Sequence, residues 1–559
     1  MKGLYFSCLT LICYVGATAV LAPINATEKN LYLRVVVNSN RDGAIQPDGV
    51  LTLREAIALV NGTLPLESLS SPERSQVSPF RGATPSQIHF QLPAGETTIR
   101  LLDELPPLAT PGLVIDGTTQ PGYKRNSPLT PTPPRPVVAL APAEGAEVFR
   151  GLTVIADGVT IRGLSLYGFT AKHRSTEVTL PADIFIASRL PVPEPGKAAA
   201  NVFPFVRGNM PPKDVVIENN WLGIPPTPNA PPTLSAFGVY VFDSLGTTIR
   251  QNWIASHDGS GIITSVRAEN LRVTYNIISS NGFAGMPDAI RLEGIIKNSQ
   301  VGKNTICENA GSGVFLFKPE GAVEIRDNQI QFNGRRLSRA AVYLMGNEHK
   351  VINNQISNQN GPGVVVASYP QSDRNIIQNN KFAALDGLSI DLNAQHNVGV
   401  EDFQQGDGPN PPRNSPNRRR DTGNAAINAP QFLAREFFVL NGKVSIDGIA
   451  DAGSQVEVYR TRGNDDAYNP LTQLLGTVET DVKGKFSITL RNLQPGERVS
   501  AIATDPKYGT SEPALNALVK SLDGTDNSRS ASPLQVIPQC AIPSPRAELP
   551  QLKLVARQR

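Results

Sequence analysis

The chain has few of the residues that build most metal and redox sites. Of its 559 residues only five are His and four are Cys, and Cys8 and Cys13 lie near the N-terminus. With no Cys/His cluster at metal-ligand spacing, most zinc sites are excluded. Charged residues make up 18% of the chain and the formal net charge is only +3. That charge is too small to indicate a nucleic-acid partner.

Long hydrophobic runs are also missing, except at the N-terminus. Met1-Lys2 precedes an apolar run from Leu4 to Ala19, with small-residue cleavage positions at Ala19 and Ala26. This favours a cleaved signal peptide over residues 1–26; the competing interpretation is an uncleaved signal anchor. After cleavage we expect no transmembrane domain and a secreted, periplasmic or cell-surface protein. We expect Cys307 and Cys540 to remain as thiols, with one disulfide as the alternative.

What the chain has in abundance is turn residues and one repeated pattern. It contains 47 Gly and 47 Pro. An aliphatic residue, an Asn three positions later and an apolar residue two beyond that recur seven times, at intervals of 24 to 32 residues. A period in that range is typical of a solenoid. The seven Asn are Asn220, Asn252, Asn276, Asn304, Asn328, Asn354 and Asn380.

A short alternating stretch accompanies each Asn pattern, from GVYVF at 238–242 to LSIDL at 388–392. Such alternation predicts strands. Coiling a repeat of three short strands stacks each strand on its copy in the next turn, which predicts parallel sheets around an apolar interior. Asn tolerates left-handed backbone angles at a bend, and its amide can bond the Asn of the next turn. The pattern therefore predicts a buried Asn ladder.

These repeats resemble the right-handed parallel β-helix proteins of the pectate-lyase-like superfamily, over residues 111–395. The resemblance implies an all-β solenoid of three sheets, one of which forms a polysaccharide groove in the enzymes of that superfamily. IDGTTQPG at 115–122 resembles the first turn of the same bacterial family. Four short motifs after the last repeat resemble the exit segment of that family: Ile390-Asp391-Leu392, Gly406-Asp407, Asp421-Thr422-Gly423-Asn424 and Asn428-Ala429-Pro430. A Pro-rich insertion at 171–213 interrupts the period and is a candidate wall of the groove.

Residues 27–110 are predicted to form an N-terminal cap region. Thr52 and Glu55 have the spacing of a capping box, ahead of an amphipathic helix. Such a helix would cover apolar core and strand edges at the open end of the solenoid. LTLREAI also resembles the "CSLREA" segment of secreted bacterial β-helix proteins, with Leu51 in place of the Cys and Thr52 in place of the Ser.

The C-terminal part lacks the Asn pattern. After an exit loop at 396–431, the alternating strands of residues 432–520 predict a small antiparallel β-sandwich. Its ending, Ala503-Thr504-Asp505-Pro506 and Thr510-Ser511-Glu512, resembles that of bacterial Ig-like modules, which space, cap or bind. Residues 521–559 have too little apolar content to fold alone and are predicted to be a disordered tail. We expect the whole protein to be a monomer.

Three acidic residues of the exit region could hold a calcium ion: Asp391, Asp407 and Asp421. They stand on Gly-rich turns, where carboxylates also serve as turn caps. The alternative is therefore that they cap turns and bind nothing. No other cofactor is expected.

The alternation places one set of side chains on the outside of the solenoid. One outward column contains Tyr240, Ile263, Arg291, Phe315, Tyr343, Val365 and Asp391, and its neighbour contains Phe242, Ser265, Glu293, Phe317, Met345, Ala367 and Asn393. The aromatic members predict an exposed face for stacking on sugar rings: Tyr240, Phe242, Phe315, Phe317 and Tyr343. The alternative is that loops of neighbouring turns cover these rings, or that they are simply strand formers.

Five ionisable residues come from adjacent turns near one edge of this face: His257, Asp258, Asp288, Arg291 and Glu293. Together they offer an acid, a base and a charge stabiliser. Arg291 and Glu293 share a face but stand about 7 Å apart along a strand, too far for an ion pair without bending. No family signature of paired Asp residues with a Gly-His-Gly turn accompanies them.

The sequence therefore predicts a secreted or cell-surface β-helix that contacts extracellular polysaccharide, or another cell-surface component, without catalysis. A first alternative is a polysaccharide lyase or glycoside hydrolase that uses the aromatic face as its cleft. A second is an inert structural scaffold, because one fold hosts many functions.

Overall fold

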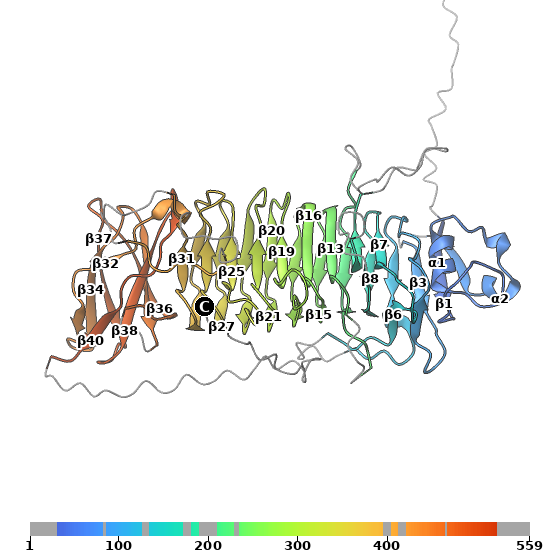
Figure 1. Cartoon of the computed structure of the whole chain (residues 1–559), viewed down its shortest axis with the longest axis horizontal. Coiled ribbons are helices and arrows are strands. Elements are labelled where there is room, and N and C mark those ends of the chain that lie inside the picture. Colours follow the sequence, from blue (N-terminus) through green and yellow to red (C-terminus); the bar gives the residue numbers. More distant parts are fainter. Residues whose placement is uncertain are drawn as a thin grey trace, which may run out of the picture.

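The computed structural model describes residues 31–81, 85–125, 133–171, 180–188, 210–227, 234–394, 404–411, 421–463 and 467–522. The predicted signal peptide at 1–26 and all but the first two residues of the predicted tail lie outside these ranges. The described molecule is an elongated solenoid of strands with helices at its N-terminal end and a separate group of strands at its C-terminal end (Figure 1). In the described part, neither α-helix has the length and hydrophobicity of a membrane span.

Three long sheets form the solenoid. Sheet A contains β2 (Val77–Arg81), β1 (Leu31–Val37), β3 (Gln87–Phe90), β5 (Val114–Asp116), β8 (Thr160–Arg162), β11 (Val216–Glu218), β14 (Thr248–Arg250), β17 (Arg272–Thr274), β20 (Ser299–Gly302), β23 (Val323–Arg326), β26 (Lys350–Ile352) and β29 (Ile376–Gln378). Sheet B contains β4 (Thr98–Leu101), β6 (Val138–Pro142), β9 (Leu164–Leu166), β12 (Trp221–Leu222), β15 (Trp253–Ala255), β18 (Ile277–Ser279), β21 (Thr305–Cys307), β24 (Gln329–Gln331), β27 (Gln355–Gln359) and β30 (Lys381–Leu385). Sheet C contains β7 (Arg150–Val154), β10 (Ala182–Ile186), β13 (Val239–Leu245), β16 (Ile262–Glu269), β19 (Ile290–Leu292), β22 (Val314–Leu316), β25 (Val342–Leu344), β28 (Val364–Val366) and β31 (Ile390–Leu392).

Neighbouring strands within each sheet are parallel, apart from the β1–β2 pair, and each pairs with its copy one turn away. Their inward side chains form one buried apolar cluster that runs along the solenoid. Burial of these aliphatic residues is the main contribution to the stability of the solenoid, because removing apolar surface from water favours the folded state. The predicted parallel β-helix is confirmed.

The predicted Asn ladder is present, and all seven Asn are buried. The backbone N–H of Asn276 donates to Asn304 Oδ1 at 2.9 Å, and its side-chain amide donates to the same oxygen at 3.0 Å. The left-handed backbone angle was assigned to the wrong residue, however. It falls on the residue before each Asn, such as Tyr275 with φ of 58°. The ladder Asn therefore supplies hydrogen bonds rather than the bend itself.

A second ladder, which was not predicted, stands five residues further along. Asn281 donates to Asn309 Oδ1 at 3.0 Å, and Asn309 donates to Asn333 Oδ1 at 3.1 Å. His257 occupies the equivalent position one turn earlier, and its backbone N–H donates to Asn281 Oδ1 at 3.3 Å. The signal was in the sequence, because these residues repeat with the spacing of the first ladder.

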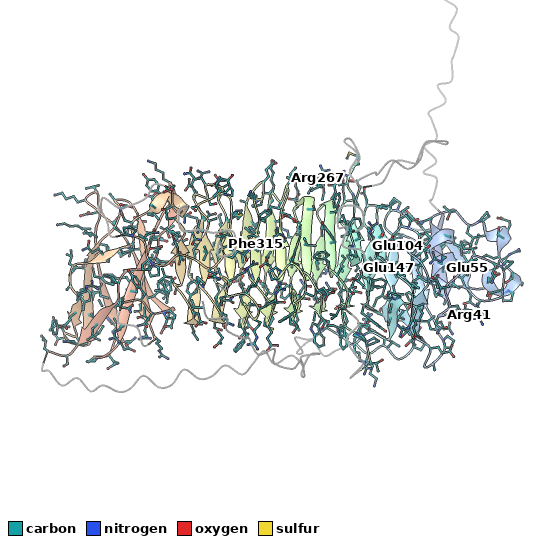
Figure 2. All side chains as sticks on the ribbon, in the orientation of Figure 1. Arg41, Glu55, Glu104, Glu147, Arg267 and Phe315 are labelled. Carbon is teal, nitrogen blue, oxygen red and sulfur yellow. The ribbon has the colours of Figure 1, made fainter. Side chains whose placement is uncertain are left out.

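The N-terminal end is closed by α1 (Leu53–Val60), which begins with the predicted capping box of Thr52 and Glu55. Figure 2 labels Glu55 at this end of the molecule. Leu53 and Ile57 join the buried core of the solenoid. Two short helical turns follow, η1 (Leu66–Ser68) and α2 (Ser71–Arg74). Sheet A already includes β1 and β3. The solenoid therefore starts before residue 111, because strands that cover the end also pair with its first turns.

The insertion at 171–213 differs from its prediction. It contains β10, which pairs with β7 and β13 as a full turn of sheet C. All five residues of β10 are buried, so the strand lacks the alternation of polar and apolar residues that marks a half-exposed strand. The rest of the predicted groove wall, at 172–179 and 189–209, lies outside the described residues.

The C-terminal unit consists of two sheets around a core of its own. One contains β32 (Gln431–Phe432), β34 (Lys443–Ile449) and β37 (Lys485–Arg491), all antiparallel. The other contains β33 (Glu436–Phe438), β40 (Ala517–Lys520), β38 (Arg498–Asp505), β35 (Gln455–Thr461) and β36 (Leu471–Glu479), with β39 (Gly509–Thr510) beside β38. Its pairs are antiparallel except β33 with β40, which are parallel.

This unit closes the far end of the solenoid. Tyr459, Leu471 and Ile502 belong to the buried cluster of the solenoid interior. The hydroxyl of Thr510 accepts the backbone N–H of Ile377 at 2.8 Å. Cys307 on β21 is disulfide-bonded, so the expectation of a buried thiol there is wrong; the other cysteines lie outside the described residues.

Candidate functional site

The outer face of sheet C carries the predicted site residues. The first outward column is in register as predicted, with Arg291 opposite Ile263 on one side and Phe315 on the other. The same column continues through Tyr343 and Val365 to Asp391. Its aromatic members belong to apolar clusters separate from the solenoid interior. The alternation along the strands was therefore sufficient to decide which side chains point outward.

The exposure expected of these aromatic rings is wrong. The side chains of Tyr240, Phe242, Phe315 and Tyr343 are 7%, 2%, 0% and 1% exposed. Rings from adjacent turns pack edge to face, as Phe315 and Tyr343 do at 5.6 Å between centroids. Figure 2 places Phe315 midway along the solenoid.

Residues beside the strands complete this outer packing. Leu180, just before β10, and Phe185, within β10, join the cluster of Tyr240, and Ala340 joins that of Tyr343. Outward aromatic side chains one turn apart are close enough to bury one another, and short flanking segments cover the rest. Of the five predicted glycan contacts, only Phe317 remains partly exposed.

A strip of alternating cations and rings leads from this packed layer to the surface. The Arg291 guanidinium lies 4.5 Å from the ring centre of Phe317 and 4.9 Å from that of Phe315. Lys318 Nζ lies 5.6 Å from the Phe317 ring centre and 5.4 Å from that of Tyr369, which is 64% exposed. We call Arg291, Phe317, Lys318 and Tyr369 the cation–aromatic strip. Lys318 and Tyr369 could not be predicted from the strand pattern, because both lie in turns beyond it.

Arg291 and Glu293 do form an ion pair, contrary to the expectation from strand spacing. Arg291 Nη2 lies 3.5 Å from Glu293 Oε2. The strand β19 ends at Leu292, and Gly294 turns the chain with φ of 80°. A long arginine side chain can then reach a carboxylate that no longer lies on a straight strand. Burial raises the pKa of Glu293, and the neighbouring Arg291 opposes that rise.

Asp288 lies close to Arg291 and is fully buried. Its Oδ1 accepts hydrogen bonds from the Ser312 backbone at 3.0 Å and from Arg339 Nη1 at 3.3 Å. Its Oδ2 lies 4.0 Å from Arg291 Nη1. Burial raises the pKa of Asp288, and Arg339 counteracts the rise. Asp288 is therefore placed as an internal counter-ion that holds two arginines.

His257 is engaged elsewhere. Its Nε2 lies 2.9 Å from Asp183 Oδ2 and its Nδ1 lies 2.8 Å from Asn281 Oδ1, and all three side chains are fully buried. Ser235 donates to the other oxygen of Asp183. The carbonyl of Asp258 accepts the backbone N–H groups of a turn at 284–285. Of the five predicted catalytic candidates, the structure places Arg291 within 4.0 Å of both Asp288 and Glu293, whereas His257 hydrogen-bonds with Asn281 of the second ladder.

The predicted calcium residues are brought together only in part. Asp391 accepts hydrogen bonds from the backbones of Asp407 at 3.3 Å and Gly408 at 3.0 Å. The third carboxylate of this cluster is Glu512 rather than Asp421, and the charges of Asp391 and Asp407 act on it. Burial, and then Asp407, raise the pKa of Asp391 to about 8. Among the described residues no group of three His, Cys, Asp or Glu is arranged to hold a metal ion. Calcium binding stays a prediction.

One family model and several solved structures match parts of the chain. Residues 293–402 match the family described as "Right handed beta helix region". No curated protein matches the sequence. Full-length tailspike protein 2 from Escherichia coli O157:H7 bacteriophage CAB120 aligns with 77% of this chain at 10% identity and a TM-score of 0.33; the match covers 63% of the tailspike, less than two thirds of its length. The A-module of mannuronan C-5 epimerase AlgE4 from Azotobacter vinelandii aligns over 65% of this chain and 89% of its own, at 14% identity and a TM-score of 0.35. The fold is a right-handed parallel β-helix.

Proposed function

We propose that this protein binds extracellular polysaccharide on the outer face of sheet C and does not cleave it. The observation that carries the proposal is the cation–aromatic strip. Tyr369 presents an exposed ring and Phe317 a partly exposed one, with Lys318 in contact with both. Flat aromatic faces pack on the apolar faces of sugar rings, and neighbouring cations bind hydroxyl and carboxylate oxygens.

We propose binding without cleavage because the carboxylates on this face are not placed to cleave a glycosidic bond. Hydrolysis of a glycosidic bond uses two carboxyl groups on either side of the bond, about 5 to 9.5 Å apart. Asp288 is fully buried and held by Ser312 and Arg339, so it cannot meet a ligand at the surface. Only Glu293 of the Asp288–Glu293 pair reaches solvent, with 23% of its side chain exposed. One partly exposed carboxylate suits binding better than acid–base cleavage.

The proposal includes an extracellular location. It is supported by the N-terminal apolar run from Leu4 to Ala19, which has the composition of a signal peptide. The binding partner we propose is thus a polysaccharide of the cell surface or its surroundings.

Polysaccharide cleavage is the second candidate, because one observation favours it. Glu293 has a pKa raised by burial and stands beside Arg291, whose side chain is 14% exposed. A carboxyl group that keeps its proton to a higher pH can act as a general acid or base, while an adjacent arginine neutralises a uronate. In that case Glu293 transfers the proton and Arg291 binds the substrate carboxylate.

The test follows retention and chain scission together, with the purified protein on neutral and uronate polysaccharides, with and without calcium. We expect retention without scission, and about tenfold weaker retention for Tyr369→Ala, as for an aromatic anchor of an interface. Phe438→Ala, at an exposed aromatic residue of the C-terminal unit, is the control and should bind normally. Scission that disappears in Glu293→Gln would establish the enzyme instead. If the protein neither retains nor cleaves any of these polysaccharides, the binding and the cleavage proposals are both refuted, and the structural scaffold is left.

A further inference from the structure

A second surface feature lies on the outside of sheet A, away from the strip on sheet C. It is a shallow depression of about 420 Å³. Its lining consists of Thr248, Arg250, Gln251, Arg272, Thr274 and Tyr275. Two arginines and an aromatic ring thus line a hollow to which no described Asp or Glu contributes.

The alternation of long and short side chains on two paired strands creates this hollow. In the register of β14 with β17, Thr248 stands opposite Arg272 and Arg250 opposite Thr274. The next residue in the second column is Gly302, which has no side chain. The short residues form a floor between two arginines, so the depression is a consequence of the repeat register rather than of a mobile loop.

Tyr275 breaks the pattern of the ladder at this point. It occupies the left-handed position before a ladder Asn, with φ of 58°, and so does Lys303 one turn later. The other turns place a short or amide side chain there, at Asn219, Gln251, Asp327, Asn353 and Asn379. A left-handed backbone is unfavourable for a residue with a Cβ, and it is rarer for bulky residues than for Asn.

The two exceptional residues are adjacent and hold each other in place. Lys303 Nζ donates a hydrogen bond of 3.0 Å to the Tyr275 hydroxyl, and it lies 5.3 Å from the ring centre. The Tyr275 side chain is nevertheless 54% exposed. A fixed, exposed ring loses little conformational entropy on binding, which favours its use as a contact surface.

The charges around the ring select the kind of ligand. Arg250 is paired with Glu218 at 2.6 Å. Arg272 donates to Gln300 Oε1 at 3.3 Å and forms no ion pair with any described residue. Its guanidinium is therefore available for an anion, and planar guanidinium groups bind carboxylate in a bidentate manner. Tyr275 beside it supplies the apolar face on which a sugar ring can stack.

We infer that this depression binds a uronate unit of an anionic polysaccharide, with the sugar ring on Tyr275 and its carboxylate on Arg272. The inference goes beyond the function proposed for sheet C, because it concerns another face of the solenoid and a ligand of defined charge. A nucleic acid would offer similar charge, but the low net charge of the chain, +3, favours the polysaccharide.

The experiment measures the affinity of the full-length protein for polygalacturonate at low salt, in a Tyr369→Ala background that weakens the site proposed on sheet C. Tyr275→Asn removes the ring and restores the residue type of the other turns, so the fold is expected to survive. Arg272→Gln removes the cation. We expect each substitution to weaken binding about tenfold, the loss typical of an anchor residue.

Lys350→Gln is the matched control, because Lys350 is an exposed cation in the same outward column as Arg272 but outside the depression. Its affinity for polygalacturonate should equal that of the Tyr369→Ala background, and no variant should bind dextran more weakly than that background does. Unchanged affinity of Tyr275→Asn and Arg272→Gln would overturn the inference, whatever Tyr369→Ala does on its own. Equal binding of single-stranded oligodeoxythymidylate, lost in the same two variants, would overturn the polysaccharide class.

Discussion

The carboxylate of Glu512 in the C-terminal unit accepts a hydrogen bond of 3.1 Å from the backbone N–H of Leu392, the last residue of the last strand of sheet C. Its other oxygen accepts the backbone N–H of Asn410 at 2.8 Å. One buried side chain thus joins the solenoid, the exit segment and the C-terminal unit. Asp391 and Asp407 lie in the same cluster, so the junction contains three carboxyl groups close together.

This cluster predicts that the junction is less stable at alkaline pH. The pKa of Asp391 is raised to about 8 by burial and by Asp407, and that of Glu512 is raised by burial. Unfolded Asp and Glu titrate near pH 4, so the stabilisation is complete below about pH 4 and is lost as pH rises through about 8. Thermal unfolding monitored by circular dichroism should therefore show a lower midpoint at pH 9 than at pH 6.

Asp391→Asn is the variant that checks the cause of this effect. An amide of the same size carries no charge at either pH, so the difference between the two midpoints should shrink. The charges that raise the pKa values of Asp391 and Glu512 are those of neighbouring acids, Asp407 for Asp391 and both Asp391 and Asp407 for Glu512. A midpoint that rises with pH in the wild-type protein would contradict the prediction.

Loss of one ladder residue should destabilise the solenoid. Asn304 donates to Val273 and to Asn328, and it accepts two hydrogen bonds from Asn276. Asn304→Ala leaves buried backbone groups without partners, which costs about 3 kcal/mol of unfolding free energy. Denaturant unfolding measures this change. Gln329→Ala, at an exposed position on β24, should alter the free energy by less than about 0.5 kcal/mol.

The contact of Asp183 with His257 predicts a structural rather than a catalytic role for the histidine. Asp183→Ala leaves His257 and Ser235 unsatisfied in the interior, so we expect a loss of about 3 kcal/mol or more in unfolding free energy. Asp183→Asn should lose less, because the amide can still pair with both. Exposed Asp386→Ala serves as the control. Equal stability of Asp183→Ala and the wild type would refute this assignment.

Gly294 is expected to be irreplaceable at the bend behind Glu293. Its φ is 80°, and a Cβ there would overlap the backbone oxygen of Ser265. Gly294→Ala should therefore cost more than about 3 kcal/mol, because the neighbouring backbone must shift. Gly95→Ala tests the backbone angle alone: φ is 84°, but nothing lies within 4 Å of the added atom. Its expected cost is only about 1 kcal/mol. Similar losses for both would show that the overlap is relieved.

Much of the solenoid could be predicted from patterns of residues close together in the sequence. The period of the Asn residues and the alternation around Tyr240 and Phe315 predicted both the stacking and the register, because in a solenoid each residue meets its own copy one turn later. The second ladder was predictable on the same ground. By contrast β10 was missed, because a strand buried on both faces has no alternation to detect.

The sequence by itself determined the parallel coil, its Asn ladder, the helix cap at Thr52 and the direction in which each strand residue points, since all of these depend on local periodicity. Tertiary structure alone decided which outward residues meet solvent. Phe315 and Tyr343 are buried by their neighbours, whereas Tyr369 and Tyr275 stand exposed in turns. It also decided that Glu512 replaces Asp421 beside Asp391, because burial and long-range contacts depend on what the rest of the chain places over each residue.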